Sequence, residues 1–249
     1  ICGEDRDNTI ITWDDHANIK MPVGGLDSEA AVKGKPMGTF RTYTLKIQGS
    51  YITLKNITIE NNAAKLGQAV SLHLEGDHIL VQNCRLLGNQ DTVYTGIANN
   101  RSAFYDCYIE GTTDFIFGPG RAWFENCEIH SKANSYITAA SSPAGQEYGY
   151  VFNKCKLTAE PGVDKVYLGR PWRPYAATLF MNCEMGSHIR PEGWHNWGKQ
   201  SNEQTARYSE YNNHGAGAAT KGRVAWSRQL TKKEAAKVTI KNVFGEEAW

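Results

Sequence analysis

The chain has 249 residues and a formal net charge of +1 at neutral pH, so we expect one domain and exclude a broad basic surface for nucleic acid. No apolar stretch approaches the roughly 18 residues that a membrane-spanning helix requires. The opening residues lack a charged segment followed by an apolar run, so we expect no signal peptide within this sequence.

In chain order, the first organised feature is a repeated short segment that carries a marker residue at its fourth position. Successive markers are 20 to 28 residues apart. Apolar residues alternate within each copy, as in a β-strand, and no helical periodicity separates the copies. Because parallel strands here have no helical crossover, the repeat predicts an all-β solenoid, a right-handed parallel β-helix. The markers are Ile57, Cys84, Cys107, Cys127, Cys155 and Cys183.

The marker cysteines favour a buried ladder of small apolar side chains. They are too far apart in sequence for a zinc site, and the seven histidines are scattered, so we predict no metal. Neighbouring rungs have the separation that a disulfide requires. A bridge Cys107–Cys127 or Cys84–Cys107 therefore remains a second interpretation.

Three further segments interrupt the repeat. Segments 133–150 and 186–222 are rich in Gly, Asn and Ser, and we expect them to be long loops on one face of the solenoid. Thr231 and Glu234 form a capping-box pattern before an alanine- and lysine-containing stretch, which predicts a short C-terminal helix.

Two aspartates carry the strongest signal for chemistry. Asp91 lies seven residues after Cys84, and Asp114 lies seven residues after Cys107. Rungs of a parallel stack are about 4.8 Å apart, so we expect the two carboxyl groups to be neighbours. Their charges repel, and one should hold its proton more tightly than the other. Such a pair suits a nucleophile and a general acid.

Other residues with chemical potential are Gln68, Gln90, Arg170 and Trp172. Singly, each has an ordinary structural explanation, such as a surface cation for Arg170 or a core aromatic for Trp172. Asp91 also has an ordinary structural explanation, since aspartate is common as the residue that caps a turn. Together they favour a site, because an arginine keeps a carboxylate ionised and glutamine amides form an oxyanion hole.

These motifs resemble those of the pectin methylesterases, carbohydrate esterases of the right-handed parallel β-helix class. Segments 114–118 and 168–172 match the family signatures in full, and 90–94 differs only by Val93 in place of leucine. The segment that begins at Gln68 departs at Ser71 and His73. The similarity covers residues 3 to 249, which implies a single domain over 1–249 that lacks the N-terminal segment of the family.

The resemblance implies a role for each matching residue. Asp114 is expected to be the nucleophile and Asp91 the general acid and later the base. Gln68 and Gln90 are expected to bind the oxyanion, and Arg170 to orient Asp114. Substrate contacts are expected from Gln68 and also from Trp172, Thr44, Phe115, Tyr94 and Trp194.

The implied activity is hydrolysis of methyl esters of galacturonosyl residues in pectin, without a cofactor. We expect a monomer that is secreted, periplasmic or on the cell surface, and that binds pectin but no nucleic acid or membrane. Two alternatives remain. One is another β-helix enzyme acting on pectin, a polygalacturonase or a lyase; the other is an inactive glycan-binding member of the fold.

Overall fold

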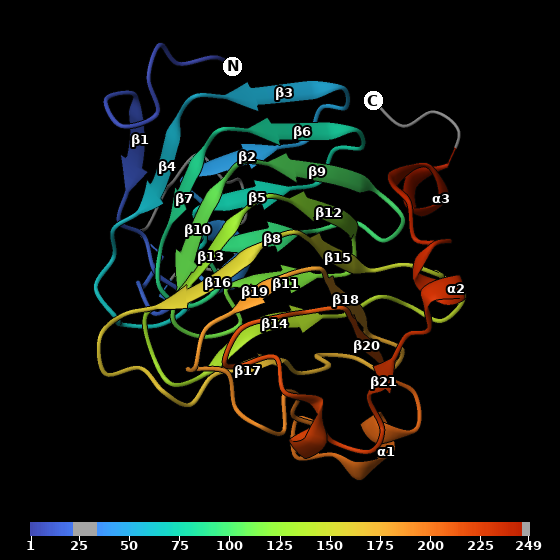
Figure 1. Ribbon diagram of the computed structural model, residues 1–249. Coiled ribbons are helices and arrows are strands. Elements are labelled where there is room, and N and C mark those ends of the chain that lie inside the picture. Colours follow the sequence, from blue (N-terminus) through green and yellow to red (C-terminus); the bar gives the residue numbers. More distant parts are fainter. Residues whose placement is uncertain (22–33, 246–249) are drawn as a thin grey trace.

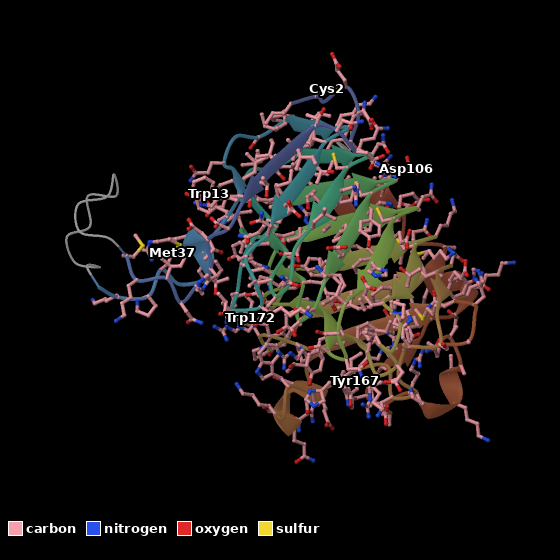
Figure 2. All side chains as sticks on the ribbon, turned by 90° about the vertical axis from the view of Figure 1, so that its left-hand side faces the viewer. Cys2, Trp13, Met37, Asp106, Tyr167 and Trp172 are labelled. Atoms are coloured by element: carbon pink, nitrogen blue, oxygen red, sulfur yellow. The ribbon has the colours of Figure 1, made fainter. Side chains whose placement is uncertain are left out.

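The computed structural model describes residues 1–21 and 34–245 of the chain. Three parallel sheets run along the molecule, and the chain visits each sheet in turn as it winds (Figure 1). The predicted right-handed parallel β-helix is confirmed. In Figure 2, Cys2 lies at one end of the stack and Tyr167 toward the other.

Each sheet is a stack of short strands in sequence order. The seven-stranded sheet contains β1 (Ile10–Trp13), β4 (Thr58–Asn61), β7 (Arg85–Leu87), β10 (Tyr108–Gly111), β13 (Glu128–Ser131), β16 (Lys156–Ala159) and β19 (Glu184–Met185). The six-stranded sheet contains β2 (Leu45–Ile47), β5 (Leu72–Leu74), β8 (Val93–Thr95), β11 (Ile116–Gly118), β14 (Tyr136–Ala140) and β17 (Tyr167–Gly169). The eight-stranded sheet contains β3 (Ile52–Lys55), β6 (Ile79–Gln82), β9 (Arg101–Tyr105), β12 (Arg121–Glu125), β15 (Tyr150–Asn153), β18 (Ala177–Met181), β20 (Arg207–Tyr211) and β21 (Arg228–Gln229).

The marker residues form the predicted ladder. Each marker immediately precedes a strand of the seven-stranded sheet, and these strands pair in register. The amide of Tyr108 donates to the Cys84 carbonyl at 2.9 Å, and the amide of Glu128 donates to the Cys107 carbonyl at 2.9 Å. All six cysteines are free thiols. The structure therefore has the ladder and not the bridge between Cys107 and Cys127 or between Cys84 and Cys107.

A stack of phenylalanine rings fills the centre of the solenoid. Phe104, Phe124, Phe152 and Phe180 occupy the same register position of four successive strands. Neighbouring rings are 4.6, 4.3 and 4.3 Å apart between centroids and nearly parallel. All four side chains are fully buried, so the repeat that marks the sequence also supplies its apolar core.

Two expected loops contain strands, which corrects the prediction. Segment 133–150 includes β14, whose last four residues are buried. A strand buried on both faces does not alternate polar and apolar residues, so its Thr and Ala gave no strand signal. Segment 186–222 includes β20, where Glu210 points inward. Glu210 forms a buried ion pair with Arg223 at 2.7 Å. A charged residue at a core position interrupts the alternation of polar and apolar residues by which a strand is recognised in the sequence.

The helices are short. They are α1 (Gln200–Glu203), α2 (Lys232–Ala235), α3 (Ile240–Phe244), and the 3₁₀ turns η2 (Thr39–Arg41) and η3 (Thr220–Gly222). The predicted capping box of Thr231 and Glu234 is confirmed at the start of α2. Val243 and Phe244 of α3 pack on the outer face of the eight-stranded sheet. No helix in the described part of the chain is long and apolar enough to cross a membrane.

Candidate active site

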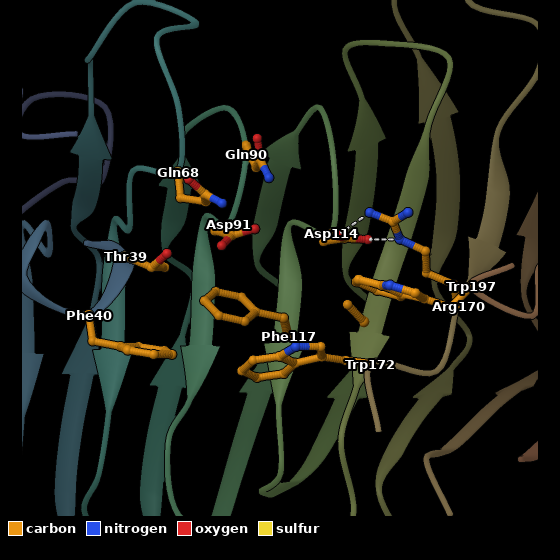
Figure 3. A pocket seen from close by; sticks show the side chains of 11 residues that line it. Thr39, Phe40, Gln68, Gln90, Asp91, Asp114, Phe117, Arg170, Trp172 and Trp197 are labelled. Carbon is orange, nitrogen blue, oxygen red and sulfur yellow. Dashed lines mark hydrogen bonds and ion pairs between the residues drawn. The ribbon is translucent and has the colours of Figure 1, made fainter. Parts of the chain in front are cut away.

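A pocket of about 200 Å³ opens on the outer face of the six-stranded sheet. Figure 3 shows two carboxylates at its centre, with glutamines on one side and aromatic rings on the other. Its lining comprises Thr39, Phe40, Gln68, Gln90, Asp91, Asp114, Phe117, Ala139, Arg170, Trp172 and Trp197.

Asp91 and Asp114 occupy equivalent positions before two paired strands. Each lies two residues before its strand, β8 or β11, and Val93 pairs with Ile116 in the register. The Asp91 amide donates to the Thr113 carbonyl at 3.1 Å, and the Asp114 amide donates to the Tyr136 carbonyl at 2.8 Å. The sheet ladder therefore continues through both aspartates and places them on adjacent rungs.

Both aspartates have a left-handed backbone conformation, with φ of 68° at Asp91 and 50° at Asp114. Aspartate tolerates this region better than most residues do. The turn interrupts the alternation of the strand, so that Phe115 and Ile116 are both in the core. The turn thus leaves the Asp114 carboxyl group on the pocket side, where Phe117 also lies.

Arg170 holds Asp114 through two parallel hydrogen bonds. Its Nε donates to Asp114 Oδ1 at 2.9 Å, and a terminal guanidinium nitrogen donates to Oδ2 at 2.6 Å. Arg170 directly follows β17, and a side chain at Gly169 would collide with the Thr138 hydroxyl group. Glycine there lets β17 approach β14, which sets the position of the arginine. A bidentate pair of this kind fixes the orientation of the carboxylate as well as its charge.

The two carboxyl groups have different electrostatic surroundings. Burial raises the pKa of Asp91 well above the usual aspartate value, the charge of Asp114 raises it further, and Arg170 opposes both effects. Burial also raises the pKa of Asp114, but there the Arg170 hydrogen bonds and charge both oppose it. Asp91 therefore has the stronger tendency to keep a proton, whereas Arg170 favours the ionised form of Asp114.

The guanidinium of Arg170 lies between two aromatic rings. Its central carbon is 3.9 Å from the ring centroid of Tyr136 and 3.8 Å from that of Trp197. Figure 3 shows the Trp197 ring beside the arginine. Cation–π contacts on both faces leave the edge of the guanidinium to bind Asp114.

The amide groups of Gln68 and Gln90 lie on the same side of the pocket, near Asp91 (Figure 3). Both residues are half-buried, and both line the cavity. Uncharged N–H donors in this position can stabilise negative charge that develops on a substrate oxygen beside the carboxylates.

Aromatic side chains form the opposite wall. Tyr94 packs between Phe40 and Phe117, at 4.9 and 4.7 Å between ring centroids, and Trp172 is 6.0 Å from Phe117. Phe40 is 45% exposed, so part of this wall is open to a ligand. Exposed ring faces beside a polar centre suit the apolar faces of sugar rings.

The structure brings together six of the expected site residues and not all of them. Gln68, Gln90, Asp91, Asp114, Arg170 and Trp172 line one pocket. Tyr94 supports the aromatic wall behind the lining.

Three expected substrate contacts are not among the residues that line this pocket. The Phe115 side chain has no exposed surface, because the turn at Asp114 directs it into the core. Trp194 is 1% exposed and packs on Tyr208 at 4.4 Å. The Thr44 hydroxyl group donates to the Glu60 carbonyl at 2.8 Å. We therefore leave these three out of the proposed site.

Five lining residues were not anticipated. Phe117 pairs with Tyr94 in the register, so the strand period alone would have revealed it. Trp197 lies three residues beyond Trp194, but nothing in the sequence shows which of the two indoles faces the pocket. Thr39 and Phe40 belong to η2, and Ala139 to β14; none of the three carries a chemical signature.

Among the described residues, no three His, Cys, Asp or Glu side chains are grouped so as to hold a metal ion. The site's polar groups are carboxylates, amides and a guanidinium, which suit acyl transfer by the side chains themselves.

Comparison with known proteins places this geometry in context. The family model Pectinesterase matches residues 5–247. Pectinesterase 31 of Arabidopsis thaliana is 39% identical over 229 residues, which is 91% of this chain and 70% of that protein. Putative pectinesterase 11 of the same plant is 33% identical over 252 residues, and this chain spans 64% of its length.

Solved structures of pectin methylesterases are similar to this chain as well. A pectin methylesterase from carrot superposes with a TM-score of 0.86 at 31% identity, covering 99% of this chain and 77% of that chain. A pectin methylesterase in complex with a hexasaccharide superposes with a TM-score of 0.80 at 28% identity, covering 98% of this chain and 82% of that chain.

Proposed function

Since this chain belongs to the pectinesterase family, we propose that it hydrolyses the methyl esters of galacturonosyl residues in pectin, releasing methanol and leaving polygalacturonate. The observation that carries the proposal is the pair of carboxyl groups on adjacent rungs, of which only Asp114 is held by Arg170. The hexasaccharide bound by one structural relative supports an extended sugar chain as the ligand.

In the first half of the reaction, the ionised Asp114 attacks the carbonyl carbon of the ester. The amides of Gln68 and Gln90 donate to the oxyanion of the tetrahedral intermediate. Asp91 gives its proton to the departing methoxide, and methanol leaves. This step leaves an anhydride between Asp114 and the galacturonate carboxyl group.

In the second half, Asp91 is ionised and accepts a proton from water. The hydroxide attacks the anhydride, and collapse of the second tetrahedral intermediate releases the galacturonic acid group, which loses its proton to solvent, and restores the Asp114 carboxylate. The proton then remains on Asp91, so the enzyme returns to its starting state with no external acid, base or cofactor.

The raised pKa of Asp91 fits both tasks. Burial and the neighbouring Asp114 charge raise it, which supplies the acid needed for methanol release. Formation of the anhydride removes the negative charge of Asp114, so Asp91 then loses its proton more readily than before. Pectin is a cell-wall polymer, so we place this activity outside the cell or in the periplasm.

The deciding experiment measures three products from highly methylated pectin: methanol, new reducing ends and unsaturated uronides. Methanol alone is expected, whereas reducing ends would indicate a polygalacturonase and unsaturated products a lyase. Asp114→Asn should abolish methanol release while preserving the fold and polymer binding, because the amide cannot form the anhydride.

The control is Asp14→Asn, the same substitution at an exposed aspartate, which should leave turnover unchanged. More than a few per cent of wild-type turnover in a folded Asp114→Asn protein would refute the nucleophile assignment.

A further inference from the structure

Trp197 has a backbone conformation that is unusual for a bulky residue. Its φ is 64°, in the left-handed region, which is unfavourable for a residue with a Cβ. Such conformations persist only where neighbouring groups hold them, and they cluster at functional sites. Trp197 lines the pocket, so the groups that hold it bear on the site.

Two side chains hold this turn. The Nδ1 atom of His195 accepts the backbone N–H of Trp197 at 3.0 Å, and the Oδ1 atom of Asn196 accepts the N–H of Gly198 at 2.8 Å. The Asn196 side chain is fixed by Glu203 at 2.6 Å. His195 is thus the side chain that binds the Trp197 backbone directly.

His195 is itself anchored beside the catalytic arginine. Its backbone N–H donates to the carbonyl of Gly169, the residue before Arg170, at 3.1 Å. Its ring lies 5.4 Å from Tyr136 and 5.3 Å from Tyr167, between centroids. The two tyrosine rings stack on each other at 5.3 Å. The imidazole therefore has a fixed place from which to hold Trp197.

We propose that His195 is a positioning residue: its Nδ1 holds Trp197 against Arg170, and Arg170, confined between Trp197 and Tyr136, orients the Asp114 carboxylate. This inference rests on the proposed function, because it assigns a task within that reaction. His195 does not line the pocket, so it acts through its neighbours and not on the substrate.

The protonation state of His195 follows from the hydrogen bond. Because Nδ1 accepts a hydrogen bond from a backbone N–H, the neutral ring carries its hydrogen on Nε2. A second proton would have to bind at Nδ1, where it would face the Trp197 N–H and break the contact. Acid should therefore release Trp197.

The charged and titratable groups around the imidazole act together. Burial lowers the pKa of His195, and the positive charges of Arg170 and Arg190 lower it further. Arg190 lies over the Tyr167 ring at 4.8 Å and is paired with Glu192 at 3.3 Å. Arg170 is paired with Asp114 at 2.6 Å, and Glu203 binds the neighbouring Asn196 side chain. Burial and both arginine charges therefore favour the neutral imidazole, the form in which Nδ1 can accept the Trp197 N–H.

Two substitutions separate the hydrogen bond from the volume of the ring. His195→Leu removes the acceptor and keeps an apolar side chain of similar size. His195→Asn provides an amide oxygen at about the distance of Nδ1 from the backbone, and this oxygen cannot be protonated in the working range. His214→Leu, at an exposed histidine outside the pocket, is the matched control.

The experiment measures kcat and KM for methanol release across pH, with folding checked by circular dichroism. His195→Leu should lower kcat by roughly tenfold to a hundredfold, the cost of a misplaced catalytic group, with a smaller change in KM. His195→Asn should restore kcat to within about threefold of the wild type. Its acid limb should also be less steep, because one protonation has been removed.

Several results would overturn the proposal. For His195→Leu, they are a wild-type kcat or a change confined to KM. For a folded His195→Asn enzyme, they are a kcat as low as that of the leucine variant or a pH–rate profile whose acid limb is as steep as that of the wild type. If His195→Leu does not fold, the acid limb of His195→Asn still decides. An inactive wild-type protein would refute the proposed function, whereas an active wild type with unaffected variants refutes only the role of His195.

Discussion

Asp91 and Asp114 occupy equivalent backbone positions on adjacent rungs, but their side chains have different neighbours. Each has a positive φ, and each amide joins the ladder of the six-stranded sheet. Only Asp114 meets the guanidinium edge of Arg170. In the proposed mechanism, a single arginine directly after β17 thus distinguishes the acid from the nucleophile at two equivalent positions.

Arg170 variants should separate charge from geometry. Removing the charge in Arg170→Gln raises the pKa of Asp114 further, so the acid limb of the rate profile should move to higher pH. The rate deficit should be roughly 10²-fold near the acid limb and shrink as pH rises and Asp114 ionises. Arg170→Lys keeps the charge but loses the planar fork, so kcat should fall with less shift of the limb.

The measurement is a pH–rate series on both variants and the wild type, with folding verified. A wild-type profile at full rate in Arg170→Gln would make Arg170 a structural residue.

At the scale of elements, the sequence predicts the solenoid well because its core repeats. The marker cysteines and the phenylalanine stack recur once per turn, and equal offsets from them predict that Asp91 and Asp114 are neighbours. The turns themselves are less predictable. Strict alternation places Phe115 on the same face as Phe117, whereas the left-handed conformation at Asp114 directs it inward.

The same limit applies where a segment has no repeat. The stretch from Trp194 to Trp197 offers two indoles, and their directions depend on the hydrogen bond from Trp197 to His195 and on the burial of Trp194 against Tyr208. Neither contact has a local sequence pattern. Motifs therefore identify the polar centre of the site together with Trp172 and Tyr94, while Phe40 and Trp197 require the three-dimensional structure.

The phenylalanine stack should contribute heavily to stability. Phe152 lies between Phe124 and Phe180 at 4.3 Å from each and has no exposed surface. Phe152→Ala should lower the free energy of unfolding by about 3–5 kcal/mol, because surrounding rungs cannot close the cavity. Denaturant titration measures the change, provided the slope of the transition is unchanged.

Phe40→Ala makes the same substitution at a ring that is 45% exposed, and it should cost much less stability. Equal losses of unfolding free energy in Phe152→Ala and Phe40→Ala would show that the phenylalanine stack contributes no more to stability than a half-exposed ring.

At the scale of the whole molecule, the three sheets form a rigid support for a polar cluster. The pocket residues come from η2, from turns and strands of the six-stranded sheet, and from the segment after β17. Strands paired rung by rung fix these distant segments relative to one another. The C-terminal α3 is tied to the far sheet, where Arg121 donates to the Val243 carbonyl at 2.8 Å, and so leaves the pocket open.

The cluster should also reduce the stability of the protein. Asp91 is buried beside Asp114, and its pKa is raised well above the usual value. An aspartate whose pKa is higher in the folded state binds more protons when folded, so its contribution to the free energy of unfolding falls as pH rises through that range. At neutral pH the active site therefore carries a cost that the neutral amide of asparagine would not.

Asp91→Asn should accordingly abolish rapid turnover and raise the melting temperature at pH 7 to 8. A gain of about 1 kcal/mol would raise Tm by roughly 2–4 °C in a protein of this size. The gain should shrink as pH falls and disappear below the pKa of an unfolded aspartate, about 3.9, where both proteins are neutral at this position. Thermal unfolding across pH tests this, with the exposed Asp14→Asn as control. A lower Tm than the wild type at neutral pH, in a folded variant, would mean that ionised Asp91 stabilises the molecule and that its assignment as the proton-holding acid is wrong.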